Sequence, residues 1–312
     1  MAFAPYKPWL SFADQVIQLK KRGLFINDDQ DAEFQLAQIG YYRLSGYFYP
    51  FRERDNSGNR SNNFVAGTQF DHILALYHFD TTIKLLALEA MQYIEIALRV
   101  QIAYALGKHN AIAHTQSRFF NPKFKHQDWL DKYQELLNAA LNSEKKDKKH
   151  IGFVLHNVTK YGGLPIWVAC ELWDFGAMSR LFQGMQATDR DGIAKIFHLS
   201  ATQLESHLQS FNFVRNVAAH HGRLWNRNMI GRPKFKKLQG QQWQLLDENA
   251  VFVVFCLMQR MLQKICPQSD WKLRFQQALA LFPQHNAAMN EVNLNTFGIH
   301  KKIDLNRWNL WR

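Results

Sequence analysis

The longest apolar periodicity in the chain runs from residue 68 to residue 106, and no proline interrupts it. Aliphatic and aromatic residues recur there at spacings of three and four, which is the pattern of a helix with a buried face. We predict one long helix, or two nearly continuous helices with a kink near residues 80–82. A chain organised around such an element is predicted to be all-α.

Two shorter amphipathic segments precede this run. Residues 12–22 follow Ser11, a suitable N-cap, and residues 28–39 begin with acidic side chains that favour a helix N-terminus. A tyrosine-rich segment, 41–51, and a polar stretch, 52–67, come next; the polar stretch has the composition of a surface loop. We therefore divide the chain into an N-terminal helical lobe with its loop at 1–67, a helical core at 68–282, and a tail at 283–312 whose tryptophans predict that it docks.

A second helix carries most of the titratable chemistry. Ser200 and Gln203 have the spacing of a capping box, which marks a helix start. Apolar residues then recur at spacings of three and four up to Val214, and Gly222 is a natural C-terminal stop. Residues 215–221 are therefore predicted to form the last two turns of this helix.

The order of residues in those two turns indicates a chemical task. Asn216 and His220 are four apart and share a helix face, and the long side chain of Arg215 can reach toward them. His220 and His221 are adjacent and diverge, so the pair is not predicted to chelate a metal. A histidine can move a proton near neutral pH, and an arginine can hold a phosphate. The set suits cleavage of an RNA phosphodiester by its own 2′-hydroxyl; the structural alternative is a buried histidine and a salt-bridged arginine.

The segment after this helix is strongly basic. Residues 215–237 hold seven Lys or Arg and no Asp or Glu, and the whole chain has a formal net charge of +12 and a pI near 9.6. Such a patch favours a polyanionic partner, with RNA the leading candidate. Glycines and prolines in residues 223–244 predict a loop or a short hairpin. The predicted RNA contacts here are Arg223, Arg227, Arg232, Lys234, Lys236 and Lys237.

Other function classes find no motif in the chain. There is no phosphate-binding Gly-x4-Gly-Lys-Ser/Thr, no dinucleotide-binding Gly-x-Gly-x-x-Gly, no His-Glu-x-x-His and no paired-cysteine zinc spacing, so no cofactor and no metal are predicted. The three cysteines form no even framework and favour a reducing, cytoplasmic compartment. No stretch of 18 uninterrupted apolar residues occurs, so no membrane association is predicted.

Two separated motifs resemble a known family. Arg215-Asn216 with His220 resembles the Arg-Asn-x-x-x-His signature of the HEPN superfamily, and the fuller string from Arg215 to Arg227 is similar to the Abi-like (abortive infection) family of bacterial phage-defence proteins. The stretches 7–11 and 40–51 are similar to the opening of the same family.

The resemblance implies a HEPN-like helical bundle and a metal-independent endoribonuclease that leaves 2′,3′-cyclic phosphate ends. His220 would be the general acid or base, and Arg215 would hold the phosphate. Asn216 would orient His220 or the phosphate, and His221 would have a supporting role. The superfamily's sites are composite, which implies a homodimer. It also implies that the long helix packs beside the motif helix, where Glu95 or Arg99 would line the groove; the structural alternative is that these two residues, four apart, form an ion pair within the helix.

Several alternatives stay open. The chain could be a non-catalytic RNA-binding protein that binds a structured small noncoding RNA, because binding and cleavage use overlapping residue types. It could be a toxic nuclease held inactive by a noncoding RNA or another antitoxin. It could also be a helical interaction protein whose basic face meets an acidic partner. In the N-terminal lobe, Arg43 and the tyrosines around it form either a stacking platform for RNA or a packing layer against the next helix.

Overall fold

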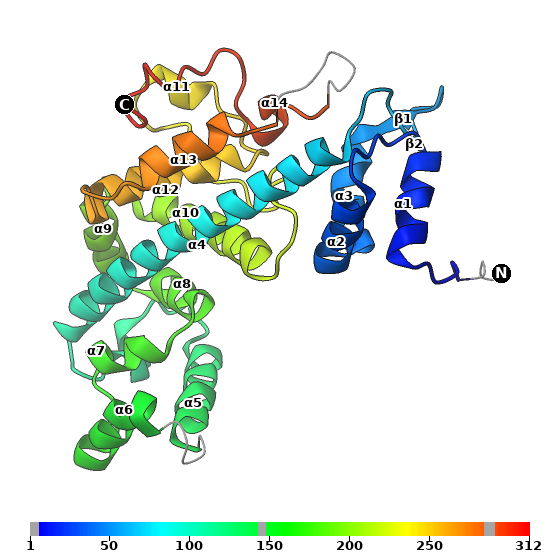
Figure 1. Cartoon of the computed structure of the whole chain (residues 1–312). Coiled ribbons are helices and arrows are strands. Elements are labelled where there is room, and N and C mark those ends of the chain that lie inside the picture. The colour runs from blue at the N-terminus through cyan, green and yellow to red at the C-terminus, as the bar shows by residue number, and fades with distance from the viewer. Residues whose placement is uncertain (1–5, 143–147, 284–290) are drawn as a thin grey trace.

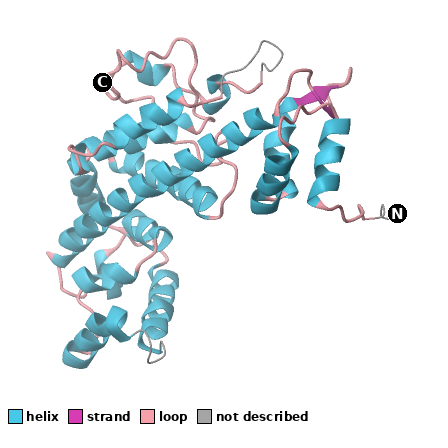
Figure 2. Cartoon of the chain, in the orientation of Figure 1, coloured by secondary structure: helices cyan, strands magenta, loops and turns pink. Residues whose placement is uncertain are grey.

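The computed structural model describes residues 6–142, 148–283 and 291–312. Its axis is α4 (Phe70–Gly107), a single helix of 38 residues, so the first of the two predicted arrangements is the one found. Figure 1 shows α4 crossing the molecule, and Figure 2 shows that helices dominate and that strands form one small hairpin. The all-α prediction is confirmed.

The N-terminal lobe lies at the start of α4 (Figure 1). The side chain of Ser11 caps its first helix by accepting from the Asp14 N–H, as predicted. The lobe consists of α1 (Phe12–Lys21), α2 (Asp29–Ile39), α3 (Tyr41–Phe48) and an antiparallel pair of strands, β1 (Arg52–Arg54) and β2 (Arg60–Phe64). The tyrosine-rich segment is thus largely a helix.

The hairpin corrects the sequence prediction. Strands were expected, if anywhere, after the motif helix, but the strands of the described residues lie within the predicted surface loop at 52–67. The turn explains why. The Asp55 carboxylate accepts the N–H groups of Ser57 and Asn59, and Gly58 takes a positive φ of 80°. These are the residue types that close tight turns.

Three helices pack along α4 (Figure 1). They are α10 (Ala201–Ala219), α12 (Phe252–Ile265) and α13 (Trp271–Ala280). The C-terminal tail joins this core through Trp311, which is 1% exposed and lies 4.9 Å, centroid to centroid, from the ring of Phe275. Residues from the lobe, the core and the tail therefore share one apolar cluster.

The remaining helices gather mainly around the C-terminal end of α4. They are α5 (His126–Asn142), α6 (Lys148–Tyr161), α7 (Ile166–Ala169), α8 (Phe175–Gly184) and α9 (Ala187–Ile196), while the short α11 (Gln241–Gln244) and α14 (Leu294–Phe297) lie near the C-terminus. Among the described residues, no helix has both the length and the apolar character needed to cross a bilayer.

Candidate functional site

The motif helix, α10, starts as predicted and ends earlier than predicted. Ser200 and Gln203 form both hydrogen bonds of the capping box. At the other end, the last helical residue is Ala219 and His220 is the C-cap. His221 and not Gly222 takes the left-handed conformation, with φ of 56°. The helix therefore ends two residues before the predicted end at residue 221, and the left-handed residue lies one position before Gly222.

Backbone hydrogen bonds explain this ending. The His221 N–H donates to the Ala218 carbonyl at 3.1 Å, and the Gly222 N–H donates to the Val217 carbonyl at 2.8 Å. These are the two bonds of a Schellman motif, in which glycine usually occupies the position that His221 holds here. At Gly222 the space is tight for a different reason, since a Cβ would come within 3.2 Å of the Val217 side chain.

Two arginines tie this helix end to α3. Arg43 donates from Nη1 to the His221 carbonyl at 2.8 Å. In the opposite direction, Arg223 donates to the Gly46 carbonyl. Burial lowers the pKa of the Arg223 guanidinium, and nearby Tyr47 acts in the opposite sense. Both arginines were predicted to contact RNA; in the structure each makes an internal contact that positions the motif loop.

Asp80, on α4, binds the same loop through its carboxylate. Its side chain is fully buried, and Oδ1 accepts the backbone N–H groups of Leu224 at 2.9 Å and Trp225 at 2.6 Å. Oδ2 accepts from the Tyr47 hydroxyl at 2.6 Å and pairs with Lys84 at 3.1 Å. Burial, and then the Asp80 carboxylate, raises the pKa of Tyr47, so this hydroxyl keeps its proton and donates.

The motif side chains lie at the protein surface. Arg215 is half-buried, and Asn216, His220 and His221 are exposed. Arg215 donates from Nη1 to Asn216 Oδ1 at 3.2 Å. The partner that Asn216 orients is therefore the Arg215 guanidinium and not the His220 ring. In the described part of the chain, no carboxylate lies within ion-pair distance of Arg215. Its charge is therefore available to an anion from outside.

The family comparison covers most of the elements described so far. A profile of the Abi-like protein family matches residues 35–226, which extend from α2 through α3 and α4 to the loop that Asp80 holds. The chain belongs to the Abi-like family. Membership indicates a role in abortive infection, a form of phage defence. No curated protein and no solved structure gives a significant match.

In this Abi-like chain the basic segment runs back along α10. Ser210 donates to the Gly231 carbonyl at 2.8 Å, and the Lys234 N–H donates to Ser206 Oγ at 3.0 Å. Lys237 borders a cavity beside Gln203, at the start of α10. Because α10 rises about 1.5 Å per residue, Lys237 lies about 25 Å along the helix from His220. The predicted cluster is thus a stripe along α10.

Members of this stripe differ in their availability. Arg232 pairs with Glu248 at 3.1 Å, and Lys236 donates to the Leu246 carbonyl at 3.1 Å. Arg227, which lies over the ring of Phe213, is exposed, as are Lys234 and Lys237. Within the described ranges, these last three have no carboxylate partner.

Glu95 and Arg99 lie elsewhere. Arg99 pairs with Glu95, with Glu171 at 3.6 Å, and donates to the Trp173 carbonyl. Asp80 marks where α4 meets the motif loop, and Glu95 follows it by 15 residues, or about 22 Å of helix. The structure does not bring Glu95 and Arg99 to the His220 end of α10.

Asp80 is the site residue that sequence reasoning missed. A signal existed: Asp80 stands between Leu76 and Ile83 at the three-and-four spacing of the apolar face, four residues before Lys84. Such a residue is buried only if it is paired and hydrogen-bonded. In the part of the chain that is described, no three His, Cys, Asp or Glu side chains are grouped as metal ligands.

Proposed function

We propose that this Abi-like protein is a metal-independent endoribonuclease of the HEPN type, acting in phage defence or in a toxin–antitoxin system. Arg215 binds the scissile phosphate, His220 transfers the proton of the 2′-hydroxyl or of the leaving 5′-oxygen, and Asn216 orients Arg215. The products carry 2′,3′-cyclic phosphate and 5′-hydroxyl ends. The observation that carries the proposal is Arg215: an arginine with no carboxylate partner among the described residues, one helical turn and a half before an exposed histidine at a helix end that α3 and Asp80 both hold.

The chemistry requires only groups that this surface offers. A guanidinium stabilises the negative charge that develops on the phosphate, and an imidazole titrates close enough to neutral pH to act as acid or base. His221 follows His220 at the C′ position, where Arg43 holds its carbonyl. We assign His221 a supporting role, as a second imidazole near the scissile bond.

One imidazole serves as acid and base in turn, or two copies of the chain each supply one. We propose the second arrangement, a homodimer in which the two α10 C-termini face each other across a basic cleft. Light scattering tests the stoichiometry, since one chain has a mass of 36.6 kDa. In a mixed dimer of one parent and one His220→Ala chain, activity should be nearly lost if both imidazoles act in one site, whereas half of the parent activity should remain if each chain acts alone.

The central experiment compares RNA cleavage by the parent and by His220→Ala in the presence of EDTA. Loss of a general acid or base lowers the rate by about 10²–10⁴-fold. His156→Ala is the matched control, because His156 is also an exposed helical histidine and lies on α6. Cyclic-phosphate ends on the fragments identify the mechanism. Equal rates for the parent and for His220→Ala would exclude it.

A second function, RNA binding without cleavage, is favoured by the exposed and unpaired Arg227, Lys234 and Lys237. In that case a structured noncoding RNA would bind along α10, and replacement of His220 would leave its affinity unchanged. RNA binding by the parent chain, with no fragments formed under several conditions, would select this function over the nuclease.

A further inference from the structure

A second cavity lies in the N-terminal lobe, away from the motif helix. Its volume is about 520 Å³, within the range of small-molecule sites. It is bounded by the chain before α1, by α1 itself, by α3 and by the hairpin. The residues that line it are Lys7, Pro8, Leu10, Gln15, Gln18, Arg22, Tyr41, Tyr42, Ser45, Arg52 and Asn62.

The charge of this cavity has one sign. Lys7, Arg22 and Arg52 line it, and its described lining residues include no carboxylate. Arg22 donates from Nη1 to the Tyr41 hydroxyl at 2.7 Å, which fixes the guanidinium and leaves its other N–H groups unused by that bond. Nε of Arg52 is buried without a hydrogen-bond partner in the described structure. These donors match the oxygen atoms of a phosphate.

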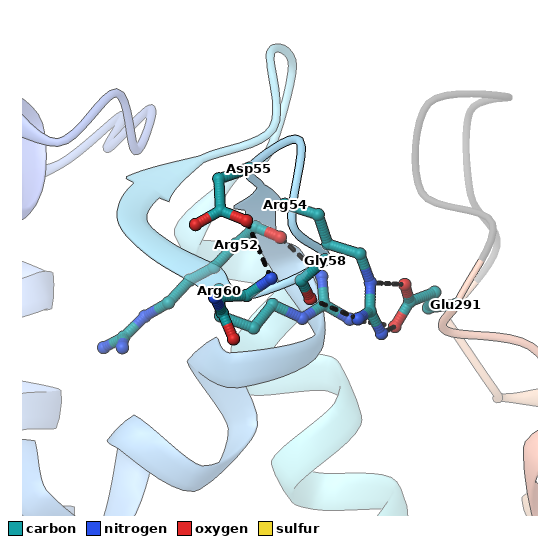
Figure 3. Close-up of polar contacts among 7 residues, drawn as sticks. Arg52, Arg54, Asp55, Gly58, Arg60 and Glu291 are labelled. Carbon is teal, nitrogen blue, oxygen red and sulfur yellow. Dashed lines mark hydrogen bonds and ion pairs between the residues drawn. The ribbon is translucent and has the colours of Figure 1, made fainter.

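The hairpin directs Arg52 toward this cavity. Arg52 and Arg54 are two apart on β1 and would share a face of a regular strand, but the register is irregular between them. Figure 3 shows the Arg52 guanidinium pointing away from the cluster in which Arg54 and Arg60 pair with Glu291. Glu291 therefore pairs with Arg54 and Arg60 and not with Arg52, and no carboxylate of the described residues pairs with Arg52.

The rim of the cavity supplies an aromatic surface. Tyr42 is 92% exposed and lines the cavity. Tyr41 behaves differently: its ring packs edge-on against Phe48 at 5.6 Å, which is a structural role. An exposed tyrosine beside arginines is the combination by which proteins hold a base and its phosphate.

We propose that this cavity binds a nucleotide unit. The base stacks on Tyr42, and Arg22, Arg52 and Lys7 hold the phosphate. The unit is either part of a single-stranded RNA or a free nucleotide; both present the same chemistry. An acidic peptide would use the three cations but would not need the ring of Tyr42.

The position of α3 gives this site its significance. Successive residues of α3 turn by about 100°, so the helix presents two faces. Tyr42 and Ser45 line the cavity, whereas Arg43 and Gly46 contact the loop that follows α10. A nucleotide in the cavity is therefore separated from the motif loop by the width of one helix, and an RNA bound there is a neighbour of the proposed catalytic site.

The test measures equilibrium binding of fluorescein-labelled oligouridine to the full-length chain carrying His220→Ala, which separates binding from cleavage. Tyr42→Ala should weaken binding at least about fivefold and leave the salt dependence unchanged. Arg52→Gln should weaken binding and reduce the slope of log K against log salt by about 0.7, the loss of one phosphate contact. Tyr104→Ala and Arg118→Gln, exposed residues at the other end of α4, are the matched controls.

Cross-linking supplies an independent readout. Oligouridine containing 5-iodouridine should cross-link on irradiation to the peptide that contains Tyr42. Competition with uridine monophosphate distinguishes the sources: strong competition assigns a free nucleotide, and weak competition assigns an RNA strand. Unchanged affinity in Tyr42→Ala would overturn the proposal. So would a loss confined to Arg52→Gln, which would mark a site for anions in general. Neither result depends on whether His220 is catalytic.

Discussion

Replacement of Asp80 tests whether the motif loop is held from α4. In Asp80→Ala the two N–H groups of Leu224 and Trp225 lose their acceptor, and Lys84, whose side chain is only 8% exposed, loses its counter-ion. Breaking a buried ion pair from one side costs about 3–5 kcal/mol, because the remaining charge is left uncompensated. We therefore expect the free energy of unfolding to fall by about that amount.

Urea unfolding followed by tryptophan fluorescence measures this loss. Asp270→Ala is the matched control, because Asp270 also pairs with a cation four residues away but is 67% exposed; it should change the free energy by less than about 1 kcal/mol. If Asp80→Ala does not fold, Asp80→Asn serves instead. Combining Asp80→Asn with Lys84→Met should recover part of the loss, since neither charge then remains. Equal effects at Asp80 and Asp270 would refute the reasoning.

Three further predictions concern stability. Burial lowers the pKa of the His114 imidazole to about 4, below its unfolded value of 6.5. The neutral imidazole therefore contributes stability above pH 6.5, and this stability is lost as the pH falls toward 4. This loss should amount to about 3 kcal/mol and should shrink in His114→Phe, as measured by urea unfolding at a series of pH values. His221→Gly should raise the free energy of unfolding by up to about 1 kcal/mol, because glycine adopts positive φ without strain; a decrease would contradict this account. Gly184→Ala should destabilise by about 1–3 kcal/mol, since its Cβ would lie 2.4 Å from the Phe124 ring, whereas Gly192→Ala, in open space on α9, should stabilise; thermal melts that show the two changes with equal sign would exclude this reading.

The sequence predicted those features that depend on local periodicity and capping. The long helix, the first two helices and the capping box of Ser200 and Gln203 are found where the patterns placed them. Each depends on residues within a few positions of one another, so no knowledge of the fold is needed. The family, too, followed from short strings. Its profile covers residues 40–51, the long helix and the motif string up to residue 226, and it leaves out residues 7–11.

Features that depend on distant contacts were not predictable in this way. The end of α10 is set by carbonyl and N–H groups that contact Asp80 and Arg43, which precede it by more than 130 residues in the sequence. The basic residues after α10 are contiguous in sequence, but side chains of α10 such as Ser206 bind their backbone and spread them along the helix. Helical wheels do not include either effect.

His221 joins these points into one argument about the site. A left-handed residue at a helix end is ordinarily glycine, and a glycine follows immediately at position 222. The chain instead places an imidazole in the strained position, and Arg43 binds the carbonyl of that residue. Strain of this kind persists when the surrounding structure imposes it, and it concentrates at functional sites. Since glycine at position 221 would be the less strained choice, we propose that the histidine is kept for its side chain, which follows His220 directly in the sequence.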